Sequence, residues 1–507
     1  MTPSINKPFF IFAALILYSD PSLFAEQPNI VIILADDLHR FDIGCFGAKN
    51  TKTPNIDSLA YEGIKFNQAY VAFAQCAPCR AELYSGSFPN RNGLIGNGIP
   101  SRSDITSIPL ELRKLGYRAG LVGKGHVGPR DVYAFDFIYG KSSDKKKSDL
   151  LEDNFDSIRE YISKDPAQPF FLAVCSHQPH KPWDKGDAST FDPDKLIIPP
   201  TYYDCIETRE ELCHYYAEVE FLDWQIGEVL KVLKESNKIE NTLIIFLSEQ
   251  GAHLPRAKFT SFDAGIHAGA IAKWPGKIAA GTSTDAIIHY ADVLPTLIDI
   301  IGGKIPDEID GKSFAGVLTG EKKSHREYAY GFTTSALPAS TPGGYGMRAI
   351  TDGRYKLIHN YHHDKTFDSP GLGGAFKAWV KYAAEDPEAA ELTNMHEHRP
   401  AMELYDISKD PWELENRVDD PELVKIKKLL IKELDNWLKQ QNDDPIQTEI
   451  KAVAGRNAKR IKAGKTLMHT ESKTSSITDS EPLEDAPLSR KEARIKRKAV
   501  AAKAEAK

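Results

Sequence analysis

The sequence predicts an α/β protein built around a mainly parallel β-sheet that is buried on both faces. Three continuous apolar runs of strand length support this prediction, at residues 28–35, 170–174 and 242–247. Runs that do not alternate between apolar and polar residues are typical of strands covered on both faces, as in parallel sheets. Helical patterns lie between these runs, and 507 residues are enough for two domains.

The first apolar run ends in two adjacent acids, Asp36 and Asp37. In open α/β sheets, ligands bind at the carboxyl ends of the strands, which is where these acids fall. Adjacent carboxylates repel each other unless a cation joins them, and hard oxygen ligands suit Ca²⁺ or Mg²⁺. The alternative interpretation of this pair is a helix cap or a turn.

The next two predicted elements lead to a segment that contains several candidate site residues. Residues 54–60 predict a helix that begins at a proline, and residues 64–72 predict a strand. In the segment that follows, Pro78 fixes a turn before the helix-like run 80–84, and a helix N-terminus favours anions. Arg80 offers a fork of donors that suits a tetrahedral oxyanion. We therefore expect sulfate or phosphate beside a reactive or modified Cys76, the alternative being a disulfide or a buried thiol.

Two later strand ends carry further candidates. A strand at 116–122 leads into Gly-Lys-Gly-His, which places Lys124 and His126 two residues apart on a glycine-rich turn. The strand at 170–174 leads to His177 and His180, which are flanked by prolines. A cation and an imidazole together hold an anion and transfer a proton. The alternatives are a surface turn for the first pair and a structural role for His177.

The third apolar run ends in Glu249 and Gln250, after a helix predicted over 207–235 from its apolar spacing. A smaller unit begins near Gly320, with a hairpin signal at 351–353 and an amphipathic helix over 421–440. Residues 360–400 read as an insertion. Its histidines are expected to line the rim of a cleft or to face solvent, metal binding being the alternative: His362, His363, His396 and His398.

The two ends of the chain predict an export signal and a basic tail. Residues 8–18 form an apolar run that is too short to span a bilayer, and Ala25 marks a cleavage site; a buried N-terminal strand is the alternative. Residues 451–507 carry 15 Lys or Arg against 7 Asp or Glu, although the whole chain has a net charge of −7. This tail is expected to be disordered or loosely helical, and either solvated or bound to an anionic glycan. Six cysteines do not indicate a disulfide scaffold, although Cys205 and Cys213 could pair.

Residues 76–86 carry the pattern Cys-x-Pro-x-Arg followed by Leu-x-x-Gly, which resembles the signature of the type I sulfatases. These enzymes belong to the alkaline phosphatase superfamily, and their signature cysteine is oxidised to formylglycine. The resemblance covers residues 28–440, and residues 123–137 look like heparan N-sulfatase in particular. Cys79 departs from the family, which usually has Ser or Ala at that position.

The fold implied by this resemblance has two parts. A large α/β domain with a mixed, mainly parallel sheet between helices is followed by a small C-terminal α+β domain with an antiparallel sheet. The expected boundaries are 1–25 for the signal peptide, 26–320 for the catalytic domain, 321–440 for the C-terminal subdomain and 441–507 for the basic tail.

The resemblance also implies roles for the site residues. The hydrate of formylglycine at Cys76 supplies a hydroxyl nucleophile, His180 protonates the departing oxygen or nitrogen, and His126 helps the hydrate to expel sulfate. The transferring sulfuryl group is stabilised by three cationic side chains, Arg80, Lys124 and Lys258. A divalent cation, Ca²⁺ rather than Mg²⁺, is bound by Asp36, Asp37, Cys76, Glu249 and Gln250. The family carries Asp-Asn or Asp-His where this chain has Glu249 and Gln250, each one methylene longer.

The expected activity is hydrolysis of sulfate esters or N-sulfates of a sulfated oligo- or polysaccharide. The expected partners are that substrate and a formylglycine-generating maturation enzyme, with no nucleic acid and no membrane span, in an exported (periplasmic or secreted) protein. Gln178 departs from the heparan N-sulfatase pattern, so the choice between N-sulfate and O-sulfate stays open. Two alternatives remain. One is a phosphatase or phosphodiesterase of the same superfamily, and the other is an inactive glycan-binding relative, which Cys79, Glu249 and Gln250 motivate.

Overall fold

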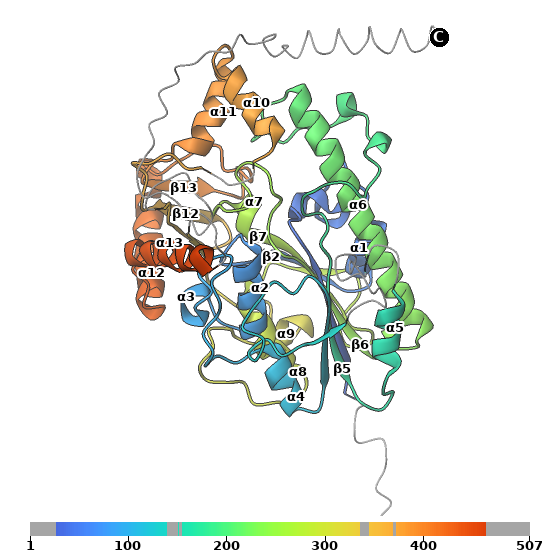
Figure 1. The fold of residues 1–507 in the computed structure, drawn as a ribbon. Coiled ribbons are helices and arrows are strands. Elements are labelled where there is room, and N and C mark those ends of the chain that lie inside the picture. Colours follow the sequence, from blue (N-terminus) through green and yellow to red (C-terminus); the bar gives the residue numbers. More distant parts are fainter. Residues whose placement is uncertain (1–26, 139–150, 152–154, 335–343, 369–371, 463–507) are drawn as a thin grey trace, which may run out of the picture.

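A computed structural model describes residues 27–138, 151, 155–334, 344–368 and 372–462, with side chains described as far as residue 458. Two β-sheets organise these residues, each with its own helices (Figure 1). The predicted signal peptide and the chain beyond residue 462 lie outside the described residues. Within them, no helix combines the length and the apolar character that crossing a bilayer requires.

The larger sheet is mixed but mainly parallel, as the sequence predicts. β7 is antiparallel to both of its neighbours, whereas the other pairs in this sheet are parallel. In spatial order the strands are β4 (Asp136–Ile138), β3 (Arg118–Gly123), β5 (Phe170–Cys175), β1 (Asn29–Ala35), β6 (Thr242–Ser248), β7 (His267–Lys273), β2 (Ile64–Tyr70) and β8 (Thr282–Thr284), and β9 (Ile288–His289) also pairs with β2.

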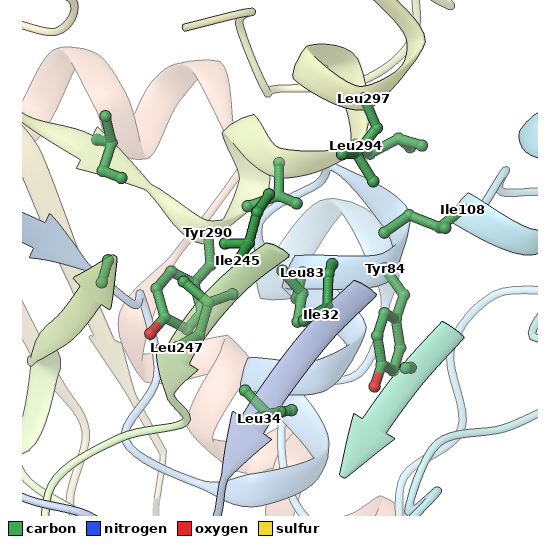
Figure 2. Packing of buried hydrophobic residues seen from close by; sticks show 14 of the residues in the cluster. Ile32, Leu34, Leu83, Tyr84, Ile108, Ile245, Leu247, Tyr290, Leu294 and Leu297 are labelled. Atoms are coloured by element: carbon green, nitrogen blue, oxygen red, sulfur yellow. The ribbon is translucent and has the colours of Figure 1, made fainter. Parts of the chain in front are cut away.

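β1 lies in the middle of this sheet because every one of its side chains is apolar or buried. Ile32 pairs with Ala173 of β5 on one side and with Ile245 of β6 on the other. Alternate residues of β1 enter different hydrophobic clusters, Ile32 and Leu34 on one face and Ile33 on the other. Figure 2 shows the first cluster, in which Ile32 and Leu34 are drawn with apolar side chains of the helices that cover this face.

Helices cover both faces of the larger sheet. The first face packs against α2 (Cys76–Ser85), α4 (Ile108–Lys114) and α8 (Val293–Ile300), and the second against α1 (Pro54–Tyr61), α5 (Asp156–Ser163) and α6 (Ile206–Glu235). The remaining short helices are α3 (Pro89–Asn92), α7 (Asp263–Ile266) and α9 (Ala315–Leu318). The 3₁₀ turns are η2 (Arg40–Asp42), η3 (Gly44–Phe46), η4 (Ala188–Thr190), η5 (Pro193–Lys195), η6 (Ile239–Asn241), η7 (Tyr290–Asp292) and η8 (Pro421–Leu423).

The smaller sheet is antiparallel and confirms the predicted C-terminal α+β unit. Its order is β10 (Ala329–Thr333), β11 (Met347–Thr351), β12 (Tyr355–Asn360) and β13 (Met402–Asp406), and β11 and β12 form the predicted hairpin. The predicted amphipathic helix is α12 (Val424–Gln440), which contacts β11 and β12. The α/β fold class expected from the sequence is therefore confirmed.

The segment interpreted as an insertion is largely helical. It forms α10 (Gly374–Tyr382) and α11 (Pro387–Glu397), which lie beside one end of α6 (Figure 1). Trp379 is buried there, and its Nε1 donates to Thr208 Oγ1 of α6 at 2.8 Å. His396 is buried among Phe367 and Phe376. Among the described residues, none of the histidines of this segment belongs to a group with metal-binding geometry.

Two further features bear on the sequence predictions. Cys205 and Cys213 are both free thiols, so the pairing that the sequence left open is not formed. The expected tail begins with an ordered helix, α13 (Pro445–Lys462), which lies close to α12 in Figure 1.

Candidate active site

The candidate site lies where the carboxyl ends of β1, β3 and β6 meet the start of α2. Asp36 and Asp37 follow β1, Glu249 follows β6, and Cys76 is the first residue of α2. One ligand atom from each of these four side chains lies within 4.8 Å of all the others, and all four residues are buried. The strand ends predicted from the apolar runs therefore converge on the signature cysteine.

Cys76 is held at the N-terminus of α2 with its thiol facing the acids. Its Sγ lies 3.4 Å from Asp36 Oδ1 and 3.3 Å from Lys258 Nζ. The neighbouring Ala77 N–H donates to Asn97 Oδ1 at 3.0 Å, which fixes the first turn of the helix. Both Cys76 and Cys79 are free thiols, so the disulfide alternative does not hold in this structure.

Each buried acid of the site has a cationic partner. Lys124 forms an ion pair with Asp36, Lys258 Nζ donates to Asp37 Oδ2 at 2.6 Å, and Arg80 forms an ion pair with Glu249. Burying a carboxylate is costly unless it is paired, so these cations allow three acids to converge in the interior.

The pKa values of the site follow from burial and from these partners. Burial alone would raise the pKa of Asp36, but Lys124 lowers it, followed by a hydrogen bond with Glu249 and by Arg80 and Lys258, and the net pKa lies well below the ordinary value. Burial raises the pKa of Glu249 to about 8; Arg80 opposes this rise and the nearby Asp36 carboxylate adds to it. Burial, Asp36 and Glu249 together raise the pKa of the Cys76 thiol.

Glu249 and Gln250 reach the same cluster despite their extra methylene groups. The backbone N–H of Glu249 donates to Ala35 O at 2.7 Å, so the chain leaves β6 alongside the end of β1. Gln250 Nε2 donates to Asp37 Oδ1 and lies 3.9 Å from Cys76 Sγ. Gln250 Oε1 is buried and has no hydrogen-bond partner among the described residues.

This donor set fits a divalent cation. One oxygen from each of three carboxylates lies within 4.8 Å of the others, and turning the Gln250 amide over would bring its unpartnered oxygen to the place where Nε2 now contacts Asp37. Hard oxygen donors of this kind suit Ca²⁺ and Mg²⁺, and Ca²⁺ is the more tolerant of irregular geometry.

The predicted histidines lie at different depths. His180 Nε2 is 3.7 Å from Asp37 Oδ2, and its Nδ1 contacts the Lys181 carbonyl. His126 is exposed and adopts a positive φ of 51°, and it lines a cavity next to Ala77. The structure thus brings the residues to which the resemblance assigned roles into the buried cluster or its border, except His126, which lines the adjoining cavity.

Sequence reasoning missed two residues that shape the site. The ring centroid of His253 lies 6.4 Å from that of His180 and 5.4 Å from that of Phe259. A histidine three residues after Gln250, on the loop that leaves β6, was the available signal. Asn97 was also missed, since an isolated asparagine in a loop gives no sign that it holds the start of α2.

Comparisons with known proteins agree with this geometry. The sulfatase family model matches residues 28–303, and a model described as N-sulphoglucosamine sulphohydrolase, C-terminal, matches residues 256–370. An ulvan-active sulfatase of Formosa agariphila is 35% identical over 431 residues, which cover 83% of this chain and 82% of that protein. The human N-sulphoglucosamine sulphohydrolase is 25% identical over 478 residues, covering 83% of this chain and 91% of that protein.

A solved structure described as a complex with its substrate D-glucosamine-2-N,6-O-disulfate shares the fold. Its TM-score is 0.66 at 21% identity, and the match covers 83% of this chain and 99% of that chain. The sulfatase family in general implies a divalent metal and a formylglycine, and the acidic residues around Cys76 form a group that could hold a metal ion. The resemblance seen in the sequence is therefore confirmed: the chain belongs to the sulfatase family of sulfuric ester hydrolases.

Proposed function

We propose that this protein removes sulfate from a sulfated saccharide through a formylglycine formed from Cys76. The observation that carries the proposal is the convergence of three acids and three cations on the first residue of α2. The names of the relatives support the substrate class, since one is active on ulvan, another on N-sulphoglucosamine, and a third binds a glucosamine disulfate.

Position 76 supplies the nucleophile in this proposal. As an unmodified thiol it is a poor one, because burial and the two nearby carboxylates raise its pKa and keep it protonated. The contacts of Sγ stand for those of the hydroxyl oxygens after modification. Asp36 Oδ1, 3.4 Å from Sγ, is then placed to accept the proton of the attacking hydroxyl.

The metal ligands in this proposal are the carboxylates of Asp36, Asp37 and Glu249, the amide oxygen of Gln250 and the modified side chain at position 76. We propose Ca²⁺ as the ion. When bound, it neutralises sulfate oxygens and lowers the pKa of the hydroxyl.

Three cations hold the sulfuryl group in place. Arg80 is fully buried beside the cluster, where it pairs with Glu249 and donates to the Lys124 carbonyl. Lys258 Nζ lies 3.3 Å from Sγ, and Lys124 stands beside Asp36. Donors fixed in this way stabilise the charge that develops on the transferring group.

The two histidines transfer protons in this proposal. His180 lies next to Asp37 at the border of the cluster, where it can protonate the departing oxygen or nitrogen. His126 lies at the adjoining cavity and assists the later expulsion of sulfate from the modified side chain.

Two finer expectations complete the proposal. The protein is exported, with residues 1–25 as its signal, and it requires a formylglycine-generating enzyme in the same host. Expression with and without such an enzyme tests the second point, because the proposal predicts sulfate release only from the modified protein.

The test of the proposed function is sulfate release from a panel of N- and O-sulfated oligosaccharides, measured by ion chromatography. The Cys76→Ala variant is the control, and matched phosphate esters run in parallel. We expect sulfate from at least one saccharide with the parent and none with the variant. Preferred release of phosphate contradicts the sulfatase assignment, and glycan binding without sulfate release by a formylglycine-containing protein supports the inactive relative instead.

A further inference from the structure

A cavity of about 530 Å³ lies directly beside the first turn of α2. Ala77, the residue after Cys76, and His126 form the part of its lining that adjoins the candidate site. The volume falls within the range of roughly 300–1,000 Å³ that is usual for small-molecule sites. Most of the remaining lining is apolar: Leu94, Ile99, Pro100 and Val127.

Helix α13 supplies another part of this lining, through Gly455 and Ala458. The helix is anchored just before its start, where Arg348 donates from Nε and Nη2 to the Asp443 carboxylate at 2.6 and 3.1 Å, with both side chains buried. Ala452 is fully buried, and Gly455 and Ala458 follow it at intervals of three residues. Residues three apart share a helix face, so the packed face of α13 continues into the cavity lining.

The small size of Gly455 and Ala458 leaves the cavity open on the side formed by α13. Gly455 has no side chain, and a Cβ placed there would meet Ile99 Cδ1 at 3.5 Å, which is ordinary van der Waals contact. A larger side chain at this position therefore has to extend into the space between α13 and Ile99. The exposure of Gly455 and Ala458 indicates that neither residue is needed for core packing.

α13 lies outside both family matches, which end at residues 303 and 370. The sequence of this helix contains five Lys or Arg residues and one Glu. A helix with this excess of positive charge favours a polyanionic ligand in its vicinity. The apolar lining, in turn, suits the C–H face of a sugar ring.

We propose that this cavity binds the saccharide that carries the reacting sulfate, and that Gly455 and Ala458 of α13 limit the size of that saccharide. This inference rests on the proposed function, because it assumes that the substrate is a sulfated saccharide. It makes the start of the basic tail a specificity element of the active site.

The test uses the variants Gly455→Leu and Ala458→Leu, whose larger side chains extend from α13 into the cavity. The matched control is Ala454→Leu, which adds a side chain to an exposed residue of the same helix that does not line the cavity. Leucine is a stronger helix former than glycine and close to alanine, so all three variants should fold, as thermal unfolding will show.

The substrate for this test is the sulfated oligosaccharide that the parent hydrolyses. We expect its KM to rise roughly tenfold or more in both cavity variants, an effect of the size seen when a pocket no longer fits one substrate group. We expect kcat to change much less, because the added side chains reduce binding and not the chemical step. The control should keep the parental KM. Unchanged KM values in both cavity variants, with an active parent, would overturn the inference.

A parent that releases no sulfate contradicts the proposed function rather than the cavity assignment. In that case, calorimetry with the same oligosaccharides measures binding directly. Weaker binding by the two cavity variants than by Ala454→Leu supports the assignment, and equal binding refutes it.

Discussion

Variants of the buried ion pair between Arg80 and Glu249 distinguish what these residues contribute to stability from what they contribute to catalysis. Both side chains are fully buried, and Arg80 also donates from Nη1 to the Lys124 carbonyl. The change to make is Arg80→Ala, which leaves the Glu249 carboxylate buried beside Asp36 without its cation. The second change is the double variant Arg80→Ala/Glu249→Gln, which removes both charges of the pair.

Because the pKa of Glu249 is already raised to about 8, Glu249 stays neutral at pH 7 when Arg80 is removed, and the expected loss of stability is that of a buried charge-assisted hydrogen bond, about 1.5–3 kcal/mol. The double variant also removes the acid that must take up a proton on folding at pH 7, so it should recover most of the loss. Activity should behave differently. Removing one donor to a developing oxyanion lowers kcat by about 10²–10³-fold, and the double variant cannot restore that donor.

Urea unfolding in the presence of a chelator measures stability without the contribution of metal, and sulfate release measures activity. Arg80→Lys serves as a control that keeps the charge but not the fork of donors. A double variant as unstable as Arg80→Ala contradicts the assignment of the cost to the unpaired Glu249. An Arg80→Ala variant with more than about a tenth of parental kcat contradicts the catalytic role.

Three further predictions concern metal, stability and the signature. Treatment with a chelator should abolish sulfate release, and Ca²⁺ should restore it and raise the unfolding temperature; unchanged activity without metal contradicts the assigned ligands. Burial alone would raise the pKa of Asp292, but Arg326 and His325 hold it well below its ordinary value. This stabilisation is present above the unfolded pKa of about 3.9 and is lost as pH falls toward the folded value. Asp292→Asn should therefore cost about 3–5 kcal/mol at pH 7 in chemical unfolding and less below pH 4, whereas a pH-independent cost contradicts the charge argument. Cys79 Sγ donates to Glu249 O at 2.9 Å, a contact that a hydroxyl can replace, so Cys79→Ser should retain formylglycine by mass spectrometry and activity within a few-fold; loss of both would show that the thiol is required.

Much of the site could be predicted because it depends on strand ends. Continuous apolar runs located β1, β5 and β6, and the carboxyl ends of parallel strands meet at one edge of a sheet. Asp36 and Glu249 both follow such strands, and the resemblance to the sulfatases assigned both of them to one metal site. The sequence could not show whether Glu249, with its extra methylene, still reaches the cluster, since that depends on the Arg80 guanidinium it meets there.

Other parts of the fold could not be predicted from local sequence patterns. β7 was not predicted, because its run His-Ala-Gly-Ala-Ile-Ala-Lys has only one β-branched residue among three alanines and a glycine, which are depleted in strands. Gly269 in this strand is explained by packing, as a Cβ there would come within 2.8 Å of Ile43 Cδ1. α10 depends on burial of Trp379 against α6, and α13 on the ion pair that precedes it. Such long-range contacts cannot be read from local composition.

The most direct test of the account is the mass of the peptide that contains Cys76, taken from protein made in its native host or with a formylglycine-generating enzyme. The account predicts the mass of the aldehyde or its hydrate in place of the thiol. An unmodified thiol in that peptide, from protein that nevertheless releases sulfate, would contradict the proposed nucleophile.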